Sequence, residues 1–215
     1  MKFLILTDLH GKRSAMDWIN PLIKRENIGC VLFLGDAVAT PEPAENSVKM
    51  VSMIEAPRIL AVQGNIDDAE LPGNWGPGIE DMHGKGMQVD NVYIAGCGGS
   101  NPTIFDTPCE YPEEEIYDIL DPVSKEGMVL MVHCPAYGIR DHIPTGLSVG
   151  SKSVLEIVKK YRPKVVLSGH IHEDIGMEEI DGTVFVNPGP AMDGRCAILD
   201  TDGGKYELRL LGPTD

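Results

Sequence analysis

The chain lacks the cysteine patterns that mark disulfide-rich or zinc-knot proteins. Its 215 residues contain five cysteines, an odd number, and no two of them are spaced as a CxxC pair. A disulfide framework and a structural zinc knot are therefore both disfavoured as the basis of the fold. The five thiols are expected to be reduced and mostly buried: Cys30, Cys97, Cys109, Cys134 and Cys196.

Long hydrophobic runs are also missing. No segment approaches the roughly 20 apolar residues that a membrane-spanning helix requires. The apolar run after Met1-Lys2 already ends before Asp8, and no small-residue cleavage site follows it, so it does not read as a secretory signal. We therefore expect a cytoplasmic protein that does not enter the membrane.

Positive charge is scarce, because 18 lysines and arginines stand against 33 aspartates and glutamates, giving a net charge of −15. Such a surface repels phosphate backbones and anionic lipids, which disfavours broad nucleic-acid binding and membrane docking. A small phosphorylated substrate remains compatible with it. Two divalent cations would bring more positive charge to one place than Asp8 and Asp36 could cancel.

What remains is the composition of an ordinary globular domain. Hydrophobic residues make up 42% and charged residues 24% of the chain, which is enough to bury one sizeable core. No flexible linker, charge block or internal repeat divides the sequence. A single domain over residues 1–215 is the prediction.

Strand-like and helix-like segments alternate through the first two thirds of the chain. Buried strands are predicted over 2–6, 30–34, 58–62, 128–132 and 164–167, a strand pair over 85–89 and 92–96, and helices over 13–25, 44–54, 112–120 and 151–161. Short strands over 175–180, 183–186, 195–200 and 205–210 are predicted to finish the chain as a meander. These elements predict an α/β fold of two packed sheets flanked by helices.

Five of the predicted strands run directly into residues that can bind a metal ion. In open α/β sheets, ligands lie just beyond the carboxyl ends of the strands. Any one of these residues, taken alone, is also explained as a turn residue or a hydrogen-bonded core histidine. Ordinary loops do not explain the whole set: Asp8, His10, Asp36, Asn65, His133, His170 and His172.

The donor types favour a hydrolytic centre with two metal ions. Carboxylate, amide and imidazole ligands without thiolate suit a site that keeps water bound to the metals. Two ions about 3.5–4 Å apart can share a bridging water whose pKa falls toward 7. The resulting hydroxide is a nucleophile for in-line attack on a phosphate ester. Manganese is the favoured metal, and nickel, iron, cobalt and zinc are alternatives.

The order and spacing of the motifs resemble those of the calcineurin-like metallophosphoesterase superfamily, above all its small single-domain prokaryotic members. The motifs are Asp8-Leu9-His10, Gly35-Asp36, Gly64-Asn65, His133 and Gly169-His170-Ile171-His172. The resemblance implies a two-sheet β-sandwich flanked by helices, the four-layer αββα arrangement. It also implies metal roles: Asp8, His10 and His172 on one ion, Asn65, His133 and His170 on the other, and Asp36 bridging both.

The sequence departs from the monoester-cleaving members of that superfamily at one position. Many of them carry a histidine directly after the asparagine, where it protonates the leaving group, whereas here Ile66 follows Asn65. The substitution favours a phosphodiesterase. Asn65 is retained as a catalytic and substrate-binding residue. Asp67 is either a catalytic residue that orients a ligand or water, or a turn residue.

Candidate phosphate-binding residues lie on the loop over residues 135–150. Arg140 and His142 are predicted to contact the substrate, and His142 is also a candidate catalytic group, if the loop closes over the site as a lid. An ordinary surface loop is the alternative. The protein Ser/Thr phosphatases of the superfamily carry an arginine shortly after the bridging aspartate. Here Ala37 follows Asp36, so a protein phosphatase is disfavoured.

The sequence therefore predicts a phosphoesterase with two divalent metal ions, more specifically a phosphodiesterase, acting on a small phosphorylated substrate. The alternative is a non-catalytic scaffold of the same fold that binds partner proteins. Such scaffolds typically lack one or more metal-binding histidines, and this sequence retains the complete set. A homo-oligomer is compatible with the sequence, which leaves the oligomeric state open.

Overall fold

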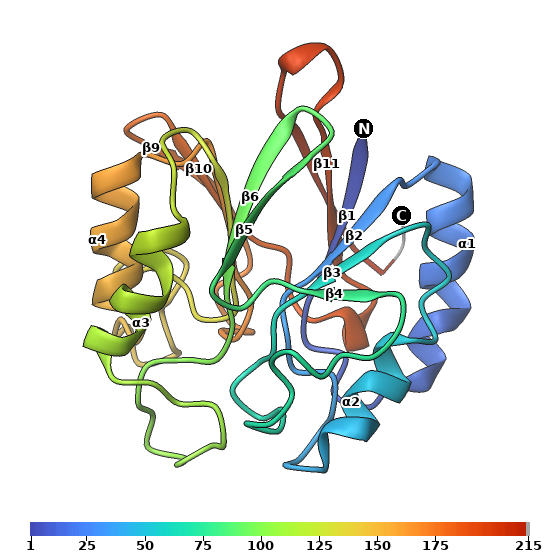
Figure 1. The fold of residues 1–215 in the computed structure, drawn as a ribbon, viewed down its shortest axis with the longest axis horizontal. Coiled ribbons are helices and arrows are strands. Elements are labelled where there is room, and N and C mark those ends of the chain that lie inside the picture. The colour runs from blue at the N-terminus through green and yellow to red at the C-terminus, as the bar shows by residue number, and fades with distance from the viewer. Residues whose placement is uncertain (214–215) are drawn as a thin grey trace.

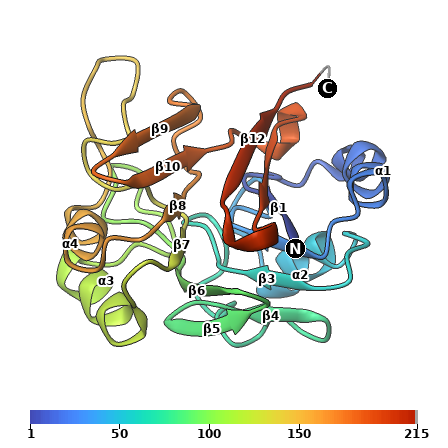
Figure 2. The same ribbon diagram turned by 90° about the horizontal axis from the view of Figure 1, so that it is seen from above.

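Two six-stranded sheets packed face to face form the centre of the molecule in a computed structural model that describes residues 1–213 (Figure 1). Helices α1 and α2 lie on the outer side of one sheet, and α3 and α4 on the outer side of the other (Figure 2). The predicted α/β architecture of two packed sheets flanked by helices is confirmed. The helices are α1 (Met16–Glu26), α2 (Ala44–Val51), α3 (Glu113–Leu120) and α4 (Lys152–Tyr161).

The first sheet has the order β12-β11-β1-β2-β3-β4. Strands β1 to β4 run parallel, and β11 and β12 are antiparallel additions at one edge. The strands are β1 (Lys2–Leu6), β2 (Cys30–Phe33), β3 (Ile59–Ala61), β4 (Ile79–Asp81), β11 (Cys196–Asp200) and β12 (Glu207–Leu211). Three of the predicted metal-binding motifs follow β1, β2 and β3.

The second sheet has the order β5-β6-β7-β8-β10-β9. Its four central strands are parallel, while β5 and β9 pair antiparallel at the two edges. The strands are β5 (Lys85–Val89), β6 (Val92–Cys97), β7 (Val129–Val132), β8 (Val165–Leu167), β9 (Gly176–Ile180) and β10 (Thr183–Asn187). The remaining motifs follow β7 and β8.

The central strands are buried on both faces, which explains their continuous apolar sequences. In β1, Phe3 and Ile5 pack between the two sheets, whereas Leu4 and Leu6 face the helices. This alternation is the two-residue period of a strand. All four side chains are fully buried, so β1 is fixed in register by both layers of the core.

The prediction of a terminal meander is wrong. Strands β9 and β10 belong to the second sheet, whereas β11 and β12 complete the first, where Ile5 pairs with Ala197. Turn residues predict where strands end but not which sheet receives them. Strand β4 was also not predicted, because its three residues, Ile-Glu-Asp, form no apolar run. Within residues 1–213, no helix has both the length and the apolar character needed to cross a membrane.

Replacing Leu60 by alanine should lower the free energy of unfolding by about 2–5 kcal/mol, because a fully buried side chain between the two sheets is lost and leaves a cavity. Leu147→Ala is the matched control, since this leucine is 64% exposed and its truncation should cost no more than about 0.5 kcal/mol. Urea denaturation measures both. Equal losses in the two variants would contradict the assigned core.

Candidate metal centre

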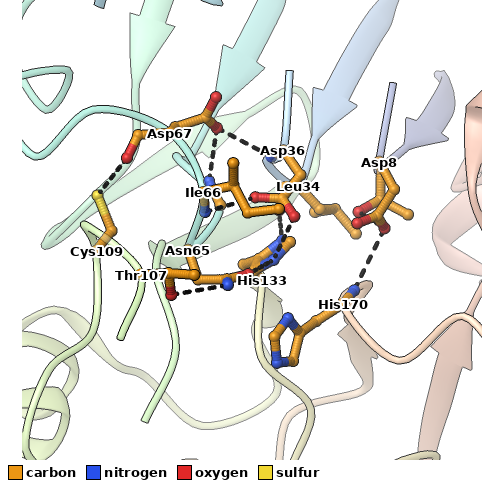
Figure 3. Close-up of polar contacts among 12 residues, drawn as sticks. Asp8, Leu34, Asp36, Asn65, Ile66, Asp67, Thr107, Cys109, His133 and His170 are labelled. Atoms are coloured by element: carbon orange, nitrogen blue, oxygen red, sulfur yellow. Dashed lines mark hydrogen bonds and ion pairs between the residues drawn. The ribbon is translucent and has the colours of Figure 1, made fainter. Parts of the chain in front are cut away.

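The predicted metal ligands meet at one edge of the two sheets. Asp8 and His10 follow β1, Asp36 follows β2, Asn65 follows β3, His133 follows β7, and His170 and His172 follow β8. Parallel strands place their carboxyl ends at the same edge, which brings residues far apart in the sequence together. Figure 3 shows this for Asp8, Asp36, Asn65, His133 and His170.

Four of these residues adopt the left-handed backbone conformation, which is unusual outside glycine. Their φ angles are 55° at Asp8, 42° at His10, 57° at Asp36 and 67° at His170. Each costs on the order of 1–3 kcal/mol, and such strain clusters at functional sites. Hydrogen bonds between loops hold it in place: the Asp8 N–H donates to the Gly35 carbonyl at 2.9 Å, and the His10 N–H to the Asp36 carbonyl at 3.0 Å.

Asp8, His10 and His172 form the first compact group. Asp8 Oδ1 lies 3.5 Å from His10 Nε2 and 3.1 Å from His172 Nε2, and the two imidazole nitrogens are 3.4 Å apart. The other carboxylate oxygen accepts a 2.6 Å hydrogen bond from the Thr7 hydroxyl, whereas Oδ1 is buried without a well-aligned hydrogen bond. A buried oxygen facing two imidazole nitrogens is a donor set that suits a divalent cation.

Asp8, Asp36 and His133 form a second group, which shares Asp8 with the first. Their potential ligand atoms all lie within 4.8 Å of one another. Asp36 Oδ2 is 3.6 Å from His133 Nε2 and 3.9 Å from His10 Nε2, so this carboxylate lies between the two groups. It is therefore placed where it could contact two ions at once.

The electrostatics of the two carboxylates differ. Burial raises the pKa of Asp36 well above its usual value, and the charges of Asp8 and Asp67 add to this effect. Burial also acts to raise the pKa of Asp8, but the imidazoles of His10 and His172 outweigh it, so the pKa lies well below its usual value. Close carboxylates repel each other, and cations between them would relieve that repulsion.

The orientation of His133 is fixed by its second ring nitrogen. Nδ1 of the buried ring lies 2.8 Å from the Leu34 carbonyl, so Nδ1 carries the proton and donates. The lone pair of Nε2 then faces Asn65 Oδ1 at 2.9 Å. Two acceptors at that distance repel each other, whereas a cation ligated by both would remove the repulsion. The donor set thus fits a metal ion at this second position.

His170 lies beside these groups without joining either compact cluster. Its ring is edge-on to that of His133, with centroids 5.1 Å apart, and its backbone N–H donates to Asp8 Oδ2 at 3.3 Å. Burial lowers the pKa of His170 to about 3, which keeps the ring neutral, the state required of a metal ligand.

Asp67 is hydrogen-bonded to neighbouring loops, and its catalytic role stays a prediction. The side chain is fully buried, and its carboxylate accepts hydrogen bonds from the Asp36 and Gly64 N–H groups at 2.9 and 2.8 Å and from the Ser47 hydroxyl at 2.7 Å. These donors occupy the carboxylate, so it braces the loops after β2 and β3. This geometry corresponds to the alternative prediction for Asp67, a turn residue.

Arg140 and His142 are engaged with acidic residues, not directed to the ligand groups. Asp174 lies 3.3 Å from Arg140 Nη1 and 2.8 Å from His142 Nδ1, and Glu178 is 2.8 Å from Arg140 Nε. The side chain of His142 is half exposed. These ion pairs join the loop over 135–150 to Asp174, in the loop after β8, and to Glu178, in β9. A contact with substrate stays a prediction.

One contact to the candidate ligand Asn65 was not predicted. The Asn65 Nδ2 amide donates to the Thr107 hydroxyl at 2.9 Å (Figure 3). Thr107 lies in an irregular loop 42 positions further along the chain, and no periodic pattern or motif connects it to Asn65. Only the folded structure reveals the pair.

Comparisons with known proteins identify a family and a relative. Residues 1–204 match the model of the calcineurin-like phosphoesterase superfamily domain. Uncharacterized protein MJ1162 of Methanocaldococcus jannaschii is 31% identical over 199 residues, which cover 88% of each protein.

Solved structures of low sequence identity share the fold. A dimetal phosphatase from Danio rerio has a TM-score of 0.69 at 12% identity, with 99% of this chain and 96% of that chain covered. An archaeal phosphodiesterase has a TM-score of 0.58 at 21% identity, with 98% and 100% covered.

The metal-free protein should lose stability as the pH falls below 6.5, in part through His170. The unfolded chain takes up a proton there that the folded chain, with a pKa near 3, does not, so acid favours unfolding. His170→Asn should therefore lose less stability than the wild type between about pH 7 and 5. Urea denaturation with chelator present measures this difference.

His142→Asn is the control for that measurement. Asp174 raises the pKa of the exposed His142 above its usual value, so the stability that this pair adds is present at acid pH and is lost as the pH rises. As the pH falls, His142→Asn should thus lose more stability than the wild type, whereas His170→Asn should lose less. Parallel curves for His170→Asn and the wild type would show that His170 is not buried in its neutral form.

Proposed function

The chain belongs to the calcineurin-like phosphoesterase superfamily, and on that basis we propose that it is a phosphodiesterase that uses two divalent metal ions. The observation that carries the proposal is two adjoining groups of possible ligand atoms, one with His10 and His172 and the other with His133, and an Asp36 carboxylate oxygen 3.9 Å from His10 Nε2 and 3.6 Å from His133 Nε2. When bound, the ions would supply a nucleophile from water at neutral pH and neutralise charge that develops on the phosphoryl group.

We assign the first ion to Asp8, His10 and His172, whose ligand atoms are mutually close. Asn65, His133 and His170 would hold the second, and Asp36 would contact both. The Leu34 carbonyl orients His133, and the Val38 carbonyl, 3.3 Å from His10 Nδ1, orients His10. In each ring the opposite nitrogen, Nε2, is thereby left to bind metal. Manganese is the favoured ion, and nickel, iron, cobalt and zinc suit the same donors.

The preference for diesters rests on Ile66. Its backbone N–H donates to Asp36 Oδ1 at 3.0 Å, which places residue 66 directly beside the proposed centre, yet its side chain has no proton to give. A leaving group that needs protonation would therefore depart slowly. The substrate is proposed to be small, because a net charge of −15 repels long polyanions.

We also propose a cytoplasmic location. All five cysteine side chains are buried, and Cys30, Cys97, Cys109 and Cys134 form no disulfide, as expected of a protein kept in a reducing compartment. Burial raises the pKa of Cys97 and Cys134 to about 12, so these thiols stay protonated and unreactive.

Hydrolysis of bis-p-nitrophenyl phosphate should occur with added manganese or nickel and stop with chelator. Asp36→Asn and His133→Ala should each reduce the rate by at least about 100-fold, since several kcal/mol of transition-state stabilisation depend on the ions. Both variants should retain the far-UV circular dichroism spectrum of the wild type. Asp174→Asn, which loosens the 135–150 loop while leaving every proposed ligand in place, is the comparison variant.

Metal content measured on the same samples separates the enzyme from its alternative. A protein that binds two ions per chain but hydrolyses neither diesters nor monoesters would instead support the non-catalytic scaffold. A protein that binds no divalent ion would refute the proposed centre itself.

Ile66→His should shift the enzyme toward monoesters. An imidazole at this position could protonate a leaving group, so the ratio of p-nitrophenyl phosphate to bis-p-nitrophenyl phosphate turnover should rise by about tenfold or more. Ile66→Leu is the matched control and should leave the ratio unchanged. An equal ratio in all three proteins would remove residue 66 as the basis of the diester preference.

A further inference from the structure

The carboxylate of Glu110 accepts several hydrogen bonds from the loop that follows β6 and approaches the candidate metal centre. Its Oε1 accepts hydrogen bonds from the hydroxyls of Thr103 and Thr107, both at 2.6 Å, and from the Thr107 N–H at 2.8 Å. Oε2 accepts from the Thr103 N–H at 2.9 Å. Four donors from two threonines thus converge on one side chain.

Glu110 is ionised at neutral pH. Burial acts to raise its pKa, but the hydrogen bonds from Thr103 and Thr107 outweigh burial and lower it to about 2. An ionised carboxylate can only accept hydrogen bonds. The single proton of the Thr107 hydroxyl must therefore point toward Glu110.

The direction of that proton determines the orientation of Asn65. With its proton committed, the Thr107 oxygen has only lone pairs left, so it can bind only a donor. The group it faces at 2.9 Å is the side-chain amide of Asn65, which must then present its Nδ2 to Thr107. The Oδ1 of the same amide is left facing His133 Nε2, at the position assigned to the second ion.

The backbone of the same loop holds Asn65 as well. The Cys109 N–H donates to the Asn65 carbonyl at 3.0 Å, and the Cys109 thiol donates to the Asp67 carbonyl at 3.1 Å (Figure 3). These bonds hold the loop that carries Thr107 against Asn65, which is only 4% exposed.

We propose that Thr107 and Glu110 are positioning residues for metal binding: Glu110 fixes the proton of the Thr107 hydroxyl, and that hydroxyl fixes the Asn65 amide with its oxygen toward the second ion. The inference rests on the proposed function, because it takes Asn65 to be a ligand. Partners of this kind behind a ligand typically change metal affinity 10–100-fold.

The test is calorimetric titration of the chelator-treated full-length protein with Mn²⁺. The wild type should bind two ions. Thr107→Val, which keeps the shape of the side chain and removes the hydroxyl, should weaken one of the two by about 10–100-fold and change the other by less than about threefold. Glu110→Gln should act on the same ion, while Thr107→Ser should restore wild-type affinity because it keeps the hydroxyl.

Thr103→Val is the matched control. It removes the other hydroxyl bound to the same oxygen of Glu110 but does not reach Asn65. Equal effects of Thr103→Val and Thr107→Val, or a failure of Thr107→Ser to restore binding, would reduce the network to a loop-stabilising role and overturn the proposal. Binding of no ion by the wild type would instead refute the proposed function, and this inference with it.

Discussion

The mutual contact of the loops that follow β1, β2 and β3 is the constraint on which the centre depends. The loops after β1 and β2 are hydrogen-bonded to each other by backbone groups, from Asp8 to Gly35 and from His10 to Asp36. The Asp67 carboxylate adds bonds to the N–H groups of Asp36 and Gly64. Because these polar groups are buried, breaking any one of the contacts would leave unpaired partners, so the loops hold each other in strained conformations.

Three of the candidate ligands are preceded by a glycine because the chain segments lie so close together there. A Cβ on Gly64 would overlap the Asp36 carboxylate, and one on Gly35 would overlap the backbone of Gly64. A Cβ on Gly169 would meet the side chain of Thr7. The glycine of each Gly-Asp, Gly-Asn and Gly-His pair thus lies where two chain segments touch. The candidate ligand is the next residue because it lies at the same contact.

The strand ends and the positions of the candidate ligands after them could be predicted from the sequence because both are local signals. An apolar run shows where a buried strand stops, and the next polar residue must lie at the edge of the sheet. The partition of the last four strands between sheets was not predictable in this way, because it depends on which edge is free. The contact of Thr107 with Asn65 and the bracing role of Asp67 were not predicted for a similar reason, because the paths of the loops determine their hydrogen-bond partners. Arg140 and His142 were predicted to contact the substrate because of their side-chain chemistry. Their acidic neighbours, Asp174 and Glu178, determine where their side chains lie.

The segment between β10 and β11 links the two sheets at the candidate centre. It passes from one sheet to the other beside the first ligand, where the Ala191 N–H bonds the Thr7 carbonyl at 2.8 Å and the Met192 N–H bonds the Asp8 carbonyl at 3.1 Å. Strand β11 then pairs with β1. Asp8 is thus held by the crossing between the sheets as well as by its own strand. Loosening that crossing would change how the two sheets meet at the candidate centre.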